Sequence, residues 1–135
     1  MQSCTKRSKN QGKRKFVFAL VQSTEDGHRV QIAKVGHHFV LPGLDISTEK
    51  AHVGAALLLE ALCGASVGAN ASIHSTLPAP AGQQLAIAQI PAGVELSPVL
   101  DITHWRAASI DELDYHLGQE WSATIRALKR VISTL

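Results

Sequence analysis

Hydrophobic residues recur along this chain with two spacings, one typical of strands and one typical of helices. Residues 16–21 form an aliphatic and aromatic run, and residues 29–35 begin with polar and apolar side chains in alternation. Both patterns favour β-strands, and the polar, glycine-containing segment 23–28 predicts that they form a hairpin. A third extended segment at 37–41 ends at a Pro-Gly pair, because proline cannot donate a hydrogen bond to a strand ladder.

The middle of the chain predicts one helix of unusual composition. Residues 48–63 are rich in alanine and leucine, with Ser47 or Thr48 as the N-terminal cap and Gly64 just after the last turn. Beyond its first turn the segment carries a single charged residue, Glu60. A helix that is apolar on nearly all sides is buried, or it presents an apolar face to another surface.

Further strands are expected in the second half of the chain. The segments 71–77 and 84–90 are predicted strands joined by a turn rich in proline and glycine, and 103–107 is a short last strand. Residues 91–101, which include three proline or glycine residues, form an irregular connection before that last strand.

Two helices are expected to close the chain. Ser109 and Glu112 have the spacing of a capping box, which predicts the start of a short helix. A final helix is expected over 118–133. The order β-β-β-α-β-β-β-α-α predicts a mixed sheet with helices on its faces, which is an α/β or α+β sandwich.

Length and composition indicate one globular domain. The chain has 135 residues, 45% of them hydrophobic, and no apolar run approaches the roughly 20 residues of a membrane span. Cys4 and Cys63 are too few for a disulfide framework, so we expect a reducing compartment and a cytoplasmic location without membrane contact. The expected organisation is a basic flexible tail at 1–15 and a domain at 16–135.

The net charge of +2 hides an uneven distribution. Residues 1–15 contain six of the 13 lysines and arginines and none of the 11 acidic residues. Such an arm could make weak, non-specific contact with nucleic acid. The alternative is a solubilising terminus, because the arm contains no aromatic residue that could stack on a base.

The element order, with Leu41-Pro42-Gly43 just before the main helix, resembles the Nudix superfamily. The signature of that family runs from a glycine through a glutamate to a closing glycine, with an Arg-Glu pair and a Glu-Glu pair in the helix between. Here Gly43, Glu49 and Gly64 keep this spacing. Residues 102–113 also look like the last strand and short helix of the family. The resemblance implies a Nudix-like α/β/α sandwich with a mixed β-sheet.

The residues that carry the chemistry of the family are replaced in this sequence. The Arg-Glu pair falls on Leu57-Leu58 and the Glu-Glu pair on Ala61-Leu62, and a shift of one residue places no carboxylate there either. In the family these glutamates hold a divalent metal, since Mg²⁺ prefers carboxylate oxygens and offsets the phosphate charge. Leucine and alanine offer no ligand atom. We therefore expect no catalytic residue, no metal site and no cofactor.

The resemblance thus implies a Nudix-fold protein that has lost divalent-metal-dependent hydrolysis of nucleoside diphosphate derivatives. Such a protein would bind a small ligand or a protein partner through the former substrate cleft. By family position, the candidate cleft residues are Lys34, Gly43, Glu49, Leu57, Leu58 and Leu62. The alternative is an active Nudix-type hydrolase whose Mg²⁺ or Mn²⁺ ligands have moved to Glu95, Asp101, Asp111 or Glu112.

Several of these residues also have a purely structural interpretation. Lys34 lies near the ligand phosphate in the family, or it is simply solvated. Glu49 in the family supports the missing arginine, or it is an acid that favours the first helical turn. Trp105 stacks on a base or packs in the core.

The leucines and histidines leave further alternatives open. The leucines line a dry cleft or an interface, or loops cover them as additional core. An apolar helix face would also be covered in a homodimer. His37 and His38 are neighbours, so in a strand they point to opposite faces and cannot share one metal.

Overall fold

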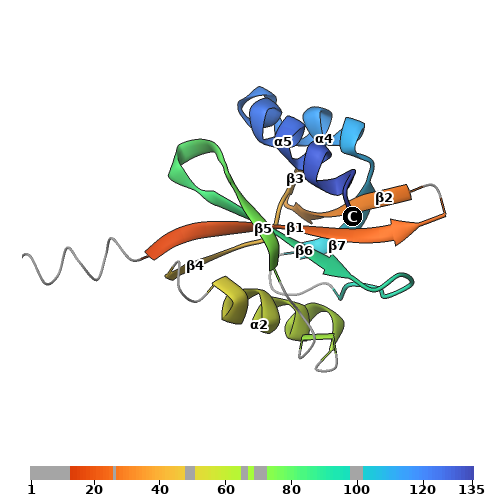
Figure 1. Ribbon diagram of the computed structural model, residues 1–135. Coiled ribbons are helices and arrows are strands. Elements are labelled where there is room, and N and C mark those ends of the chain that lie inside the picture. Colours follow the sequence, from red (N-terminus) through yellow and green to blue (C-terminus); the bar gives the residue numbers. More distant parts are fainter. Residues whose placement is uncertain (1–12, 26, 48–50, 65–66, 69–72, 98–101) are drawn as a thin grey trace, which may run out of the picture.

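A mixed β-sheet with helices on both faces forms the centre of the structure (Figure 1). The structure is a computed structural model that describes residues 13–25, 27–47, 51–64, 67–68, 73–97 and 102–135. In chain order the strands and helices are β1 (Lys13–Thr24), β2 (Gly27–Val35), β3 (His38–Val40), β4 (Gly43–Ser47), α2 (Ala51–Cys63), β5 (Ile73–Pro78), η2 (Pro80–Gly82), β6 (Gln84–Ile90), β7 (Ile102–Ala108), α4 (Ile110–Leu117), η3 (Gln119–Trp121) and α5 (Ser122–Ile132). Helix α2 lies on one side of the sheet and α4 and α5 lie on the other, which confirms the expected α/β/α sandwich (Figure 1).

Strand β1 is the central strand of the path β3-β2-β1-β6-β5, and it pairs with three other strands. Its first half pairs antiparallel with β4, with Val17 opposite Gly43, and its second half pairs antiparallel with β2. Along its other edge, β1 runs parallel to β6. Strand β2 in turn pairs with β3 and β7, and β6 pairs with β5. The hairpin predicted between the first two strands is confirmed.

Two features of the strands differ from the sequence prediction. Strand β4 was not predicted, and β1 begins at Lys13 rather than at residue 16. Both differences have one cause, since the first residues of β1 are the partners of β4. Half of the basic residues of the predicted tail therefore lie in β1. Residues 1–12 lie outside the described residues, so nucleic-acid contact by the tail stays a prediction.

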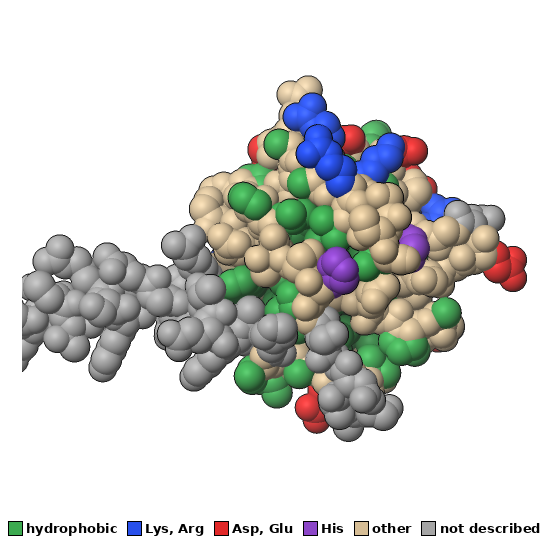
Figure 2. All heavy atoms as spheres, in the orientation of Figure 1, with side chains coloured by type: hydrophobic (Ala, Val, Ile, Leu, Met, Phe, Trp, Pro, Cys, Tyr) green, Lys and Arg blue, Asp and Glu red, His purple; other side chains and the backbone are tan. Residues whose placement is uncertain are grey.

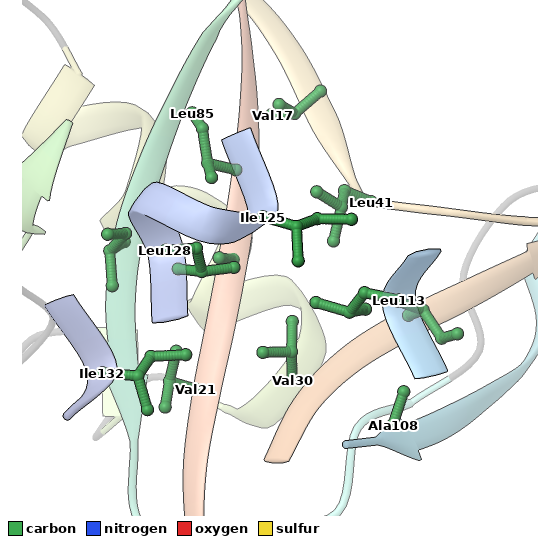
Figure 3. Packing of buried hydrophobic residues seen from close by; sticks show 13 residues of the cluster. Val17, Val21, Val30, Leu41, Leu85, Ala108, Leu113, Ile125, Leu128 and Ile132 are labelled. Atoms are coloured by element: carbon green, nitrogen blue, oxygen red, sulfur yellow. The ribbon is translucent and has the colours of Figure 1, made fainter. Parts of the chain in front are cut away.

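Alternation along β1 divides the core between the two faces of the sheet. Val17, Ala19 and Val21 pack on the side of α4 and α5, with residues such as Ile125 and Leu128 (Figure 3). Residues 16, 18 and 20, which alternate with them, pack on the side of α2. Successive side chains of a strand point to opposite faces, so one strand supplies both halves of the core.

The helices begin and end largely where the sequence predicts. Ser109 caps α4, since its Oγ accepts a hydrogen bond from the backbone N–H of Glu112 at 3.3 Å, which confirms the capping box. Gly64 follows α2 with a positive φ of 104°, a conformation that favours glycine. The predicted last helix is split into η3 and α5. Among the described residues, no helix has both the length and the apolar character that a membrane span needs.

Candidate functional site

A cavity of about 320 Å³ lies beside the segment that begins the Nudix-like motif. We call it the β3 cavity, because β3 and the residue after it form one wall and the region from the end of α4 to η3 forms another. Its lining joins segments that are far apart in the sequence. The side chains that could contact a ligand are Lys15, His38, Phe39, His116, Glu120 and Trp121.

Close packing of β1 against β4 fixes the position of the cavity. Gly43 lies opposite Val17, and a Cβ atom added to Gly43 would lie 2.9 Å from the carbonyl oxygen of Phe16 and 3.4 Å from Cε of Lys15. The backbone N–H of Phe18 donates to the carbonyl oxygen of Pro42 at 2.8 Å. Gly43 therefore has a structural role, since it lets the chain pass β1 closely beside two lining residues.

Phe39 lies at the centre of a group of aromatic and basic side chains at the cavity wall. Its ring centroid lies 5.0 Å from that of His116 and 5.8 Å from that of His104, both in edge contacts. The Lys34 Nζ lies 5.9 Å from the same ring centroid, a cation–π distance. Lys34 does not line the cavity itself but contacts a residue that does.

The ion pairs next to this group engage Glu112, one of the alternative metal ligands. Its Oε2 accepts hydrogen bonds from Nη2 of Arg106 at 2.7 Å and from Nε at 3.2 Å, and Arg29 lies 3.8 Å from Oε1. The hydrogen bond from Arg106 is the main cause that holds the pKa of Glu112 below its ordinary value. Nε2 of His116 lies 4.0 Å from the same carboxylate. Glu112 is therefore a partner of cations on the protein itself.

The other alternative metal ligands are dispersed. Asp111 lies 3.8 Å from Nζ of Lys129, and Glu95 lines a different cavity. Asp101 lies outside the described residues. In the described part of the chain, no three or more His, Cys, Asp or Glu side chains are grouped so that they could hold a metal ion.

The leucines at the motif positions of α2 have very different environments. Leu62 is completely buried in the core on the α2 side, whereas 60% of the Leu57 surface is exposed. Leu58 is half-buried and packs against the same part of the core, together with Leu96 and Trp105. The sequence left open whether these leucines line a cleft or an interface, or belong to the core. Leu62 belongs to the core and does not form part of an accessible cleft wall.

The candidate cleft residues are thus divided between the two faces of the sheet. Lys34 and Gly43 lie next to residues of the β3 cavity. Leu58 and Leu62 lie on the α2 side. Leu57 lines none of the cavities described here, and Glu49 lies outside the described residues. The assignment of a binding role to Lys34, Gly43, Leu57 and Leu58 stays a prediction.

Most of the lining of the β3 cavity was not found from the sequence. His116, Glu120 and Trp121 come from the end of α4 and from η3, and Lys15 belongs to a segment assigned to the tail. The only signal was the pair of histidines after β2, of which His38 lines the cavity and His37 is an exposed turn residue. Pairing of β1 with β4 brings Lys15 to the site.

Apart from Glu60, the exposed residues in the described part of α2 are apolar, in contrast to those of α5. Val53 and Leu57 are exposed on α2, and hydrophobic side chains are visible in the lower part of the molecule, where α2 lies (Figure 2). The exposed basic residues of α5 gather at the opposite end of this view (Figure 2). A homodimer that covers the α2 surface stays a prediction.

A second cavity, of about 520 Å³, lies on the α2 side of the sheet. We call it the loop cavity, because residues 93–96 of the connection between β6 and β7 form one wall. Gln22 and Gln31 line it from the sheet, and Trp105 and Ala107 line it from β7. Val17 of β1 lines the β3 cavity, and Gln22 of β1 lines the loop cavity. These two residues are an odd number of positions apart, so their side chains point to opposite faces of the sheet, and the two cavities therefore lie on opposite faces.

No protein-family model matches this sequence, and no curated protein does. Solved structures match over most of the chain. A binary complex of a C. elegans Ap4A hydrolase has a TM-score of 0.69 at 10% identity, with 90% of this chain and 100% of that chain covered. The M. smegmatis Nudix hydrolase RenU has a TM-score of 0.66 at 18% identity, with 90% and 86% covered.

A third similar structure holds a nucleotide derivative. The Nudix domain of Shewanella oneidensis NrtR, in complex with ADP ribose, has a TM-score of 0.54 at 11% identity, with 87% of this chain and 86% of that chain covered. Together these similarities confirm the fold that the sequence resemblance implied. The chain has the Nudix fold.

Proposed function

We propose that this Nudix-fold chain is a binding domain that holds a nucleoside diphosphate derivative in the β3 cavity without metal-dependent hydrolysis. One contrast carries the proposal. On the α2 side, the position of a motif glutamate is occupied by Leu62, which is fully buried. Beside Gly43, in contrast, a cavity lined by basic and aromatic side chains remains open.

Burial of Leu62 supports the loss of metal binding for an energetic reason. A carboxylate at this position would lie in the core, and an isolated ionised carboxylate is strongly disfavoured there. Leu58 is half-buried and packs against the same apolar core, so this second motif position also has an apolar environment. We propose that no metal cofactor is used.

The chemistry of the β3 cavity favours a ligand with an anionic part and a flat part. Lys15, His38 and His116 can donate hydrogen bonds to phosphate oxygens, and a lysine ammonium adds a positive charge. Phe39 and Trp121 supply apolar ring surface. ADP ribose is a suitable probe, because the Nudix domain of NrtR was solved with it.

Isothermal titration calorimetry with ADP ribose tests the proposal. We expect saturable binding to the unaltered protein and at least about ten-fold weaker binding to the double variant Lys15→Ala, His38→Ala, since two phosphate contacts are lost. The matched control is Lys129→Ala, His74→Ala, which removes an exposed lysine and an exposed histidine that line no cavity described here. Equal affinity of the two double variants, or no binding of ADP ribose at all, would overturn the proposal.

A hydrolysis screen separates the proposal from its alternative. With Mg²⁺ or Mn²⁺, we expect no turnover of nucleoside triphosphates, dinucleotides or nucleotide sugars. Metal-dependent turnover that is lost in Glu95→Gln or Asp101→Asn, but retained in Glu25→Gln, would instead support an active hydrolase with relocated ligands. Glu25 is an exposed residue of the turn after β1 and serves as the control.

A further inference from the structure

We propose that the loop cavity is a second binding site, separate from the β3 cavity, and that it takes an uncharged base with the hydrogen-bonding edge of adenine. The inference does not depend on the function proposed for the β3 cavity. Its basis is a pair of buried amides beside an indole ring, in a cavity whose volume of about 520 Å³ lies in the range of small-molecule sites, about 300–1,000 Å³.

The floor of the loop cavity is polar and ordered. Gln22 is 7% exposed and Gln31 is 8% exposed, although both side chains are polar. Nε2 of Gln31 donates to Oε1 of Gln22 at 2.9 Å. Nε2 of Gln22 donates to the carbonyl oxygens of Pro91 at 2.7 Å and Val94 at 2.9 Å. All hydrogen-bonding atoms of the Gln22 amide are therefore engaged within the protein.

Gln31, in contrast, keeps hydrogen-bonding capacity toward the cavity that it lines. A primary amide has two N–H donors and one carbonyl acceptor. One donor of Gln31 is used on Gln22, and within the described residues its Oε1 accepts no hydrogen bond. The remaining donor and the acceptor of one amide group lie side by side. A glutamine amide can pair in this way with the adjacent acceptor and donor of an adenine edge.

The wall of the cavity is held in place without a ligand. Nε1 of Trp105 donates to the carbonyl oxygen of Ser97 at 3.1 Å, and the backbone N–H of Ser97 donates to the carbonyl oxygen of Leu62 at 2.9 Å. These bonds attach the loop to β7 and to α2, while Gln22 attaches its other end to β1. A site fixed in advance loses little conformational freedom on binding.

Trp105 supplies the aromatic surface that a base requires. Its side chain is half-buried, packs against the core on the α2 side and also lines the loop cavity. Both interpretations left open for Trp105, core packing and stacking on a base, are therefore compatible with its position. Stacking on an aromatic side chain is favourable for any base, so the selectivity for adenine would come from Gln31.

The charge of the lining distinguishes this site from a phosphate site. Among the described residues that line the loop cavity, the titratable side chains are those of Glu95 and His104, and none is lysine or arginine. A carboxylate repels a phosphate group, and the described lining of the loop cavity has no lysine to offset it, whereas the β3 cavity has Lys15 beside Glu120. The site is therefore suited to a base or nucleoside rather than to a nucleotide held by its phosphates.

Calorimetry or saturation-transfer NMR with adenosine tests the inference. We expect adenosine to bind the unaltered protein, and guanosine to bind about ten-fold more weakly, because its corresponding edge presents two acceptors. Adenosine monophosphate should bind no more tightly than adenosine. Affinity for the monophosphate more than about ten-fold higher would overturn the inference, since it would require a cation at the site.

Two variants, each with a matched control, test whether adenosine binds in the loop cavity. Ala107→Leu fills part of the cavity from an exposed position of β7 that lies directly opposite Gln31, and we expect at least a ten-fold loss of adenosine affinity. Ala61→Leu, at an exposed position of α2 that lines no cavity described here, is the matched control and should bind normally. Gln31→Leu should also lose binding, with Gln89→Leu, an exposed glutamine of β6, as its control.

Melting curves of each variant show that a loss of binding is not a loss of fold. Normal adenosine affinity in folded Ala107→Leu would overturn the inference, as would adenosine binding that is lost in the double variant Lys15→Ala, His38→Ala. The last result would place the base in the β3 cavity. A failure of ADP ribose to bind would contradict only the proposed function, because the adenosine assay does not depend on the β3 cavity.

Discussion

The side-chain amides of Gln31 and Gln22 form a buried pair, with 2.9 Å between Nε2 of Gln31 and Oε1 of Gln22. Through Gln22 this pair joins β1 and β2 to the loop after β6. The hydrogen bonds of two side chains thus position the wall of the loop cavity. Backbone groups of the loop, rather than side chains, receive these bonds.

Gln22→Leu should therefore loosen this loop. It removes two donors and leaves Nε2 of Gln31 without its acceptor, so we expect the free energy of unfolding to fall by about 1–3 kcal/mol. Backbone amides of residues 93–97 should exchange with deuterium faster than in the unaltered protein. Gln89→Leu is the control, and unchanged exchange in Gln22→Leu would contradict the role of this residue.

Leu62 and Leu57 offer a matched comparison on one helix. Leu62→Ala should lower the free energy of unfolding by about 2–5 kcal/mol, because it opens a cavity in the core. Leu57→Ala should change it by about 0.5 kcal/mol or less, since most of this side chain is exposed. Denaturant titration measures both. Similar effects for the two variants would mean that α2 is rotated differently against the sheet.

Gly43→Ala tests the close approach of β4 to β1. The added methyl group would lie 2.9 Å from the Phe16 carbonyl oxygen, so the strands would have to separate. We expect a loss of about 1–3 kcal/mol in the free energy of unfolding. Asp45→Ala, an exposed position of the same strand, should be tolerated. Equal stability of Gly43→Ala and the unaltered protein would contradict the close approach.

Glu112 should make the stability of the protein depend on acidity. The hydrogen bond from Arg106 lowers the pKa of this carboxyl group in the folded state. Its contribution to stability is therefore present above the pKa of the unfolded chain and is lost as the pH falls through the lower, folded pKa. Between neutral and strongly acidic pH, the melting temperature of the unaltered protein should therefore decrease by more than that of Glu112→Gln.

An exposed carboxylate provides the comparison for that titration. Glu25→Gln should follow the unaltered protein, because Glu25 lies in an exposed turn and has no ion pair among the described residues. Parallel acid curves for Glu112→Gln and the unaltered protein would show that the Arg106 pair does not contribute to stability. High salt should reduce the difference, since the pair is partly exposed to solvent.

The local patterns of the chain predicted most of the elements of the fold. Alternation and apolar runs located β1, β2 and β6, and the capping box located the start of α4, because these signals depend on residues close in sequence. Strand β4 was missed for the opposite reason. Its five residues carry little pattern of their own, and they form a strand through pairing with β1.

The sequence by itself determined that the motif positions of α2 carry no carboxylate, because residue identity and spacing are local facts. Only the tertiary structure decided that Leu62 is core while Leu57 is exposed, since this depends on how α2 is rotated against the sheet. It also decided which side chains line the cavities. Lys15, His38 and His116 come from three separate parts of the chain, and it is strand pairing and helix packing that bring them to one cavity.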